Sequence, residues 1–69
     1  MEKLNCIIVR VQEQEIVERA LNTFRVGLNK WDKTKVMEVN GEFYVNYTII
    51  CTAETYNAIV NYSEAKREH

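Results

Sequence analysis

Residues 39–54, VNGEFYVNYTIICTAE, decide the fold of this chain. Asn40-Gly41 lies between two apolar runs, and this dipeptide is a strong signal for a two-residue β-hairpin loop because both turn positions favour a positive φ. Residues 34–39 and 42–52 are then the two strands of an antiparallel hairpin. With this loop the facing pairs are Val39 and Glu42, Met37 and Tyr44, and Val36 and Val45.

The second strand of this hairpin carries apolar side chains on both of its faces. Alternation along a strand sends successive side chains to opposite sides of the sheet. One side collects Val36, Phe43, Val45, Tyr47, Ile49 and Cys51, and the other collects Met37, Val39, Tyr44, Asn46, Thr48 and Ile50. A chain of 69 residues hardly needs a sheet that is buried on both sides. Something outside the monomer is therefore expected to cover the second face.

The flanking segments complete the element order. Residues 3–11, KLNCIIVRV, are apolar on both parities and predict a strand buried on two sides. Residues 12–33 change to three- and four-residue spacing and predict an amphipathic helix that ends near Trp31, with Trp31 in the core as the end of its apolar stripe. After Thr52, which can cap a helix, residues 53–69 return to helical spacing.

This order, strand-helix-strand-strand-helix, predicts one α+β domain that spans residues 1–69. The connection rules favour a β-α-β-β-α two-layer sandwich with a three-stranded antiparallel sheet of order 1-3-2 and both helices on one face. The arrangement is a truncated ferredoxin-like fold, because the usual fourth strand after the second helix is missing. The first strand is then left as an open edge.

An exposed apolar sheet face on a small protein usually marks an interface, and an open strand edge is an aggregation hazard unless something pairs with it. We therefore expect a homodimer, either through antiparallel pairing of residues 4–11 or through stacked sheet faces. The residues predicted to form the protein interface are Met37, Val39, Tyr44 and Ile50 on the open face and Ile7 and Val9 on the first strand.

Charge and composition exclude several classes of partner. The chain has 9 basic and 10 acidic residues and no basic run, which disfavours a polyanion such as nucleic acid. Its apolar runs are far shorter than the roughly 20 residues that span a bilayer, and no signal peptide opens the chain. A cytoplasmic protein without membrane contact is expected.

The two cysteines, Cys6 and Cys51, each lie inside a β-branched run. In the cytoplasm both are predicted to be free, buried thiols, although they could form a disulfide if their strands were neighbours.

The sequence offers no evident catalytic group. His69 is the single histidine and is the last residue, so neither a Cys-His nucleophile nor a zinc site has its ligands. Glu38 and Glu42 are best explained as a solvated hairpin tip. The two glycines are isolated and form no phosphate-binding loop. We expect no enzyme activity, no metal and no cofactor.

Residues 40–47, NGEFYVNY, resemble the octapeptide on the third strand of the RNA-recognition motif, and they follow the same β-α-β-β order. The matching positions are Gly41, Tyr44, Val45 and Tyr47. The resemblance implies a base-stacking role for Tyr44, since that family stacks bases of single-stranded RNA on sheet aromatics. The chain departs from the pattern at Asn40, Glu42 and Phe43 and has no aromatic residue on its first strand.

The function that these patterns favour is that of a small, non-enzymatic protein-interaction protein, of the accessory, inhibitor or adaptor kind, that acts by occupying a surface of another macromolecule. The alternative is a module that binds a small ligand or single-stranded nucleic acid on the sheet face or in a dimer cleft.

Overall fold

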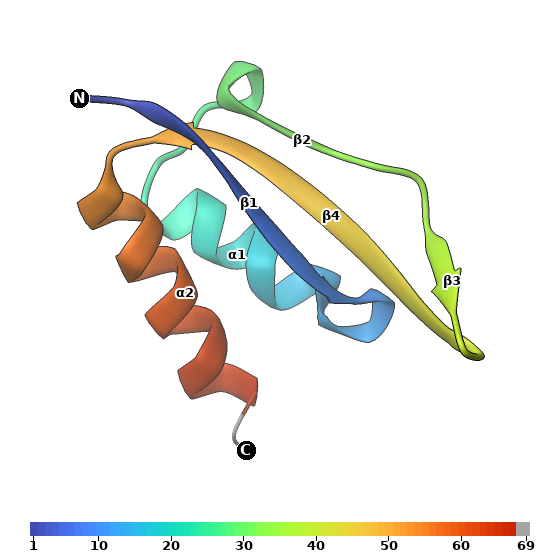
Figure 1. Cartoon of the computed structure of the whole chain (residues 1–69). Helices are drawn as coiled ribbons and strands as arrows, with labels where there is room; N and C mark the ends of the chain where they lie inside the picture. The colour runs from blue at the N-terminus through green and yellow to red at the C-terminus, as the bar shows by residue number, and fades with distance from the viewer. Residues whose placement is uncertain (68–69) are drawn as a thin grey trace.

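The computed structural model describes residues 1–67, which form an α+β domain with four strands and two α-helices (Figure 1). In chain order the elements are β1 (Lys3–Arg10), the 3₁₀ turn η1 (Val11–Glu13), α1 (Gln14–Thr23), the 3₁₀ turn η2 (Leu28–Lys30), β2 (Trp31–Lys33), β3 (Met37–Val39), β4 (Glu42–Cys51) and α2 (Ala53–Arg67). The α+β class, the antiparallel sheet and the two helices are confirmed.

The β3–β4 hairpin turns at Asn40-Gly41, as the sequence predicts. Asn40 has φ 53° and Gly41 has φ 82°, so both residues occupy the left-handed region that a tight two-residue turn requires. The predicted pairs of Val39 with Glu42 and of Met37 with Tyr44 form. Val36 and Val45 are not part of this ladder, because β3 begins at Met37.

The sheet has four strands instead of the predicted three, and β4 is its central strand. The path through the sheet is β1-β4-β2, and β3 pairs with β4 beside it. Tyr44 pairs with Arg10 of β1 and with Met37 of β3, so β1 and β3 lie on opposite edges of β4. Ile49 pairs in the same way with β1 and β2. The predicted three-strand order 1-3-2 and the truncated ferredoxin-like fold are not confirmed, because a fourth strand is present; β4 lies between β1 and the edge formed by β2 and β3.

A bulge at residues 34–36 separates β2 from β3. Lys33 faces Tyr47, whereas Met37 faces Tyr44, so three residues on this edge oppose two residues of β4. One main-chain hydrogen bond and one bond to a side chain hold the bulge: the Thr34 N–H donates to the Asn46 carbonyl at 2.9 Å, and the Asn46 N–H donates to Thr34 Oγ1 at 3.2 Å. The extra residue reverses parity, so β2 and β3 present their odd-numbered residues to opposite faces.

The first helix is shorter than the sequence predicts. It ends at Thr23, where Arg25 takes φ 58°, the Val26 N–H donates to the Leu21 carbonyl at 2.9 Å and the Arg25 N–H donates to the Asn22 carbonyl at 3.1 Å. These two bonds form a Schellman motif, which stops a helix. The predicted continuation to Trp31 is wrong: Leu28 lies in η2 with 84% of its surface exposed, and Trp31 begins β2.

Both helices lie on one side of the sheet, and the core lies between the two layers (Figure 1). The buried apolar residues are Val9, Val17, Ala20, Leu21, Val45, Tyr47, Ile49, Cys51 and Ile59. Trp31 packs against this core, with its ring 5.8 Å from that of Tyr47. The predicted contact of Trp31 with the core is confirmed, but Trp31 is half-buried and reaches the core from a strand.

Candidate functional site

The side of the sheet that the helices leave uncovered is named the open face here. Its positions follow from the strand register, because Leu4 faces Ile50, Cys6 faces Thr48, Ile8 faces Asn46 and Arg10 faces Tyr44 across β1 and β4. Met37 and Val39 of β3 extend it along the other edge. Its exposed apolar side chains are Leu4 (67% exposed), Ile8 (63%), Val39 (54%), Met37 (39%) and Ile50 (38%).

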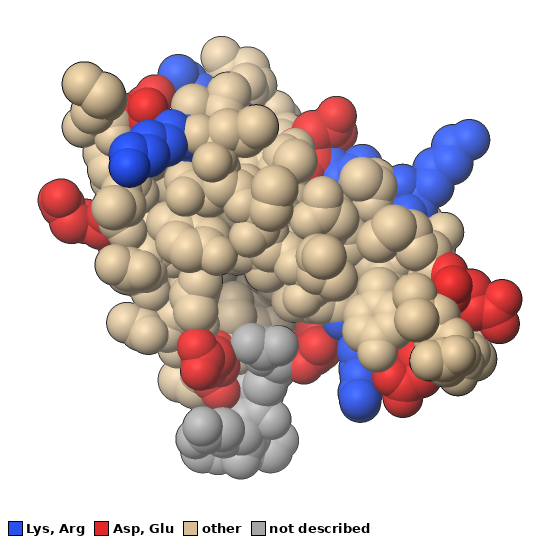
Figure 2. All heavy atoms as spheres, in the orientation of Figure 1, with Lys and Arg blue, Asp and Glu red and all other residues tan. Residues whose placement is uncertain are grey.

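The side of the molecule drawn in Figure 2 carries few charges at its centre. In the space-filling view, uncharged atoms run continuously across the middle of the molecule, and the Lys, Arg, Asp and Glu side chains gather around its margin (Figure 2). Depletion of charged residues at the centre of a surface is a feature of protein interfaces. A single exposed apolar residue needs no explanation, whereas five on one sheet face suggest an interaction surface.

Four of the six residues predicted for the interface lie on the open face: Met37, Val39, Tyr44 and Ile50. The other two, Ile7 and Val9, lie on the opposite face, where Val9 is 3% exposed in the core and Ile7 packs against it. Their side chains are therefore not available on the open face, and the prediction of the first-strand face is corrected. The reason is register, since both parities of β1 are apolar and only its pairing with β4 decides which one the helices cover.

Leu4 and Ile8 were missed by the sequence reasoning, although they are the most exposed apolar side chains of the open face. Arg10, which shares their parity, is a signal that this side faces solvent. Asn5, on the other parity, is also polar, so the sequence alone does not decide which face of the strand is exposed. The structure shows why a polar residue is tolerated at Asn5. Its side-chain amide donates to the carbonyl of Cys51 at 3.3 Å.

A polar cluster borders the open face at the hairpin. The Tyr44 hydroxyl donates to the Glu42 carboxylate at 2.7 Å, and Arg10 Nη2 lies 3.4 Å from the same carboxylate oxygen. Accepting this hydrogen bond, Glu42 raises the pKa of Tyr44. A carboxylate held beside the one open-face aromatic opposes binding of a phosphate backbone, so the geometry does not strengthen the resemblance to RNA-binding strands.

Asn46 is a polar residue in the middle of the open face, opposite Ile8. Within residues 1–67 its side-chain oxygen is enclosed and accepts no hydrogen bond. An enclosed unpaired carbonyl costs about 1–3 kcal/mol. The open face is thus not optimised for the stability of the isolated monomer.

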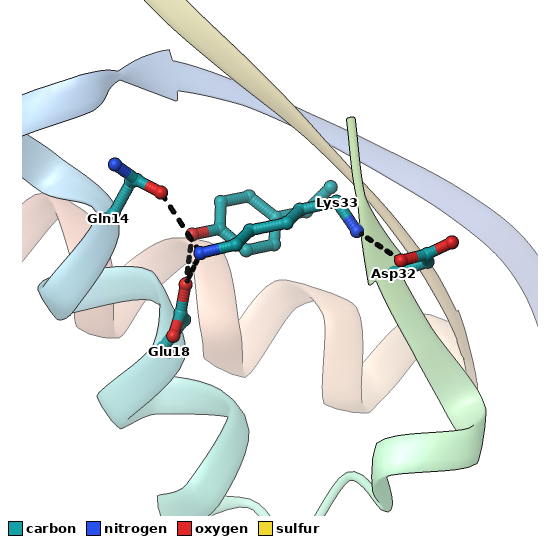
Figure 3. A network of polar contacts seen from close by, with 5 residues as sticks. Gln14, Glu18, Asp32 and Lys33 are labelled. Carbon is teal, nitrogen blue, oxygen red and sulfur yellow. Dashed lines mark hydrogen bonds and ion pairs between the residues drawn. The ribbon is translucent and has the colours of Figure 1, made fainter. Parts of the chain in front are cut away.

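On the helix side, a second polar cluster joins α1 to the sheet (Figure 3). Glu18 accepts hydrogen bonds from Lys33 Nζ and from the Tyr47 hydroxyl, each at 2.7 Å, and Lys33 also donates to Gln14 at 3.1 Å. The hydrogen bond from Lys33 lowers the pKa of Glu18, and burial raises the pKa of Tyr47. Because Tyr47 is fully buried, it offers no reacting hydroxyl to solvent, and the cluster is a structural clamp.

Metal-binding groups and surface recesses are the other places on the described residues where a ligand could bind. Residues 1–67 include no group of three side chains arranged to bind a metal ion, and His69 lies outside the described residues. A shallow recess of about 480 Å³ beside the hairpin is lined by Val11, Val36 and Phe43, with the Arg10–Glu42 pair at its side. Among the described residues, no helix is long and apolar enough to cross a membrane.

The two cysteines are free and lie on different faces of the sheet. Cys51 is buried, as predicted, and burial raises the pKa of its thiol. Cys6 is exposed, which corrects the prediction that it is buried. It belongs to the open face together with Leu4 and Ile8, so its thiol can report whether that face is covered.

Comparison of the chain with protein-family models, with curated proteins and with solved structures found no match.

Proposed function

We propose that this chain is a small, non-enzymatic interaction protein of a regulatory or accessory kind, that it forms a homodimer through the open face or the free edge of β1, and that it acts in the cytoplasm by occupying a protein surface. The observation that carries this proposal is the set of exposed apolar side chains on the open face, which are Leu4 and Ile50 at one end, Ile8 in the middle, and Met37 and Val39 at the hairpin. Catalysis has no part in the proposal.

The gain from covering these side chains supports the proposal. A fully buried aliphatic side chain contributes about 1.5–3 kcal/mol, so covering the exposed part of Leu4 or Ile8 contributes on the order of 1 kcal/mol. A domain of this size has a small core and a small margin of stability. The free energy gained when association buries several such side chains on each copy is therefore a substantial fraction of the folding free energy of the domain.

The width of the open face also bears on the dimer. The sheet is three strands wide, so the axes of β1 and β2 lie about 10 Å apart across β4. A standard interface covers ~800 Å² per partner and would therefore include residues that border the sheet as well as the open face. A two-fold axis presents the same patch on both copies, and two stacked sheets ~10 Å apart would bury both open faces.

Two matched substitutions test the proposal by sedimentation velocity. Ile8→Asp places a charge in the middle of the open face, whereas Phe43→Asp places the same charge on β4 at a side chain that is 52% exposed but has the opposite parity. We expect the wild-type chain to be dimeric at high micromolar concentration and Ile8→Asp to weaken the dimer by about tenfold or more, because the charge would be buried without a partner.

Phe43→Asp is expected to leave the dimer intact, and circular dichroism would verify that both variants fold. A wild-type chain that stays monomeric throughout the concentration range contradicts the proposal. A dimer that Ile8→Asp leaves unchanged contradicts the assignment of the open face.

A further inference from the structure

A tyrosine of the second helix reaches the outer edge of the sheet. The Tyr56 hydroxyl donates a hydrogen bond to the main-chain carbonyl of Cys6 at 3.1 Å, across 50 positions of sequence. The Tyr56 ring packs against the core, so its position is fixed by α2 and not by solvent. This contact occupies a backbone acceptor of β1, the strand at one edge of the sheet.

Strand geometry shows that this carbonyl is one that an added strand would need. The main-chain N–H and C=O of Asn46 both point toward Thr34, on the β2–β3 side of β4. Because these groups alternate along a strand, those of Val45, Tyr47 and Ile49 point toward β1, where their facing residues are Val9, Ile7 and Asn5. The main-chain groups of the intervening residues, Cys6, Ile8 and Arg10, therefore point outward at the free edge.

A second outward-pointing group is also occupied. The Arg10 N–H donates to Glu13 Oε1 at 3.2 Å, and Glu13 belongs to the η1 turn directly after β1. An incoming strand would have to compete with Tyr56 for the Cys6 carbonyl and with Glu13 for the Arg10 N–H to complete its ladder. Natural sheets protect their edges by covering them or placing charges on them. Here the phenol of Tyr56 and the carboxylate of Glu13 cover the edge of β1.

We propose that Tyr56 and Glu13 close the free edge of β1 to strand addition, so that a second copy of the chain is admitted only at the open face. The second half of this proposal rests on the proposed self-association and selects one of its two geometries. The two geometries of self-association use different parts of β1. Leu4 and Ile8 direct their side chains to the open face, whereas the main-chain groups of Cys6 and Ile8 lie at the edge.

Amide hydrogen exchange measured by NMR tests the closed edge residue by residue. The Cys6 and Ile8 amides point outward, and the Ile7 and Val9 amides of the same strand point toward β4 and serve as internal references. On raising the concentration of the wild-type chain until it associates, we expect the exchange rates of the Cys6 and Ile8 amides to stay within about twofold. A slowing by about 100-fold would show edge pairing and overturn the proposal, while leaving self-association intact.

Tyr56→Phe removes the hydroxyl and keeps the ring, and Tyr62→Phe on the same helix is its control, because within residues 1–67 the Tyr62 hydroxyl has no hydrogen bond to lose. The freed Cys6 carbonyl is expected to admit strand pairing, so that concentration slows exchange at Cys6 and Ile8 by roughly fivefold or more in Tyr56→Phe only. Equal behaviour of the two variants would overturn the role of Tyr56. If the wild-type chain does not associate at all, the proposed function fails, and this pair of variants alone decides whether the edge is closed.

Discussion

Glu18 joins the first helix to the sheet, and its environment sets a pH dependence. Its carboxylate accepts one hydrogen bond from Lys33 of β2 and one from Tyr47 of β4. The hydrogen bond from Lys33 is the main cause that lowers the pKa of Glu18 below its ordinary value of 4.5, and burial opposes that shift. A folded-state pKa that is lowered contributes stability above the unfolded pKa, and this stability is lost as the pH falls through the folded pKa.

Glu18→Gln is therefore expected to reduce the free energy of unfolding at pH 7 by about 1 kcal/mol, which is below the usual range of about 1.5–3 kcal/mol for hydrogen bonds to charged groups because the Lys33 side chain is 41% exposed. Below pH 4.5 the difference from wild type should shrink, since the wild-type carboxylate also loses its charge. Urea unfolding at pH 7 and at acid pH measures both values. Glu15→Gln, an exposed glutamate on the same helix, is the control. A deficit that is equal at both pH values would contradict the role of the charge.

Single residues also show what can be predicted from sequence at this scale. Asn40 and Gly41 specify their turn locally, because few other residues accept a positive φ at both positions. The faces of β1 are not specified locally, because Leu4, Cys6 and Ile8 on one parity are as apolar as Ile7, Val9 and Val11 on the other. Their assignment depends on a register with β4 that is set some forty residues away in the chain.

Among the elements, the first helix departs most from its predicted length. Leu28 and Trp31 continue the spacing of Leu21 and Phe24, so periodicity alone extends the helix past its real end. The Schellman motif at Arg25 ends the helix with a residue that carries no sequence signal for a left-handed conformation. The β2–β3 bulge also could not be predicted from the sequence, because Thr34, Lys35 and Val36 are residues that suit a continuous strand.

Arg25→Gly distinguishes the observed helix end from the predicted one. Glycine has no penalty at φ 58°, so this substitution is expected to raise the free energy of unfolding by roughly 1 kcal/mol. Inside a continuous helix the same substitution would lower it by up to ~1 kcal/mol. Thermal unfolding of Arg25→Gly beside Arg19→Gly, which lies within α1 and should be destabilised, gives the comparison. A loss of stability in both variants would contradict the observed end of α1.

At the scale of the whole molecule, two layers are built from elements that the sequence identifies well, and the outer side of the sheet remains apolar. The hairpin and the two helical patterns predict the α+β class, while the number of strands depends on a bulge that only the structure reveals. Of the candidate site, the β3 and β4 residues were predictable because one turn fixes their register. Leu4 and Ile8 were not, because no local feature fixes the register of β1.

The alkylation rate of Cys6 as a function of protein concentration tests directly whether a second copy covers the open face. Cys6 is exposed on that face, and the buried Cys51 thiol is an internal reference within the same chain. Covering of the face predicts that Cys6 reacts rapidly in dilute solution and several-fold more slowly at the concentrations where dimers form, while Cys51 stays slow throughout. A Cys6 rate constant that does not change across that range would contradict it.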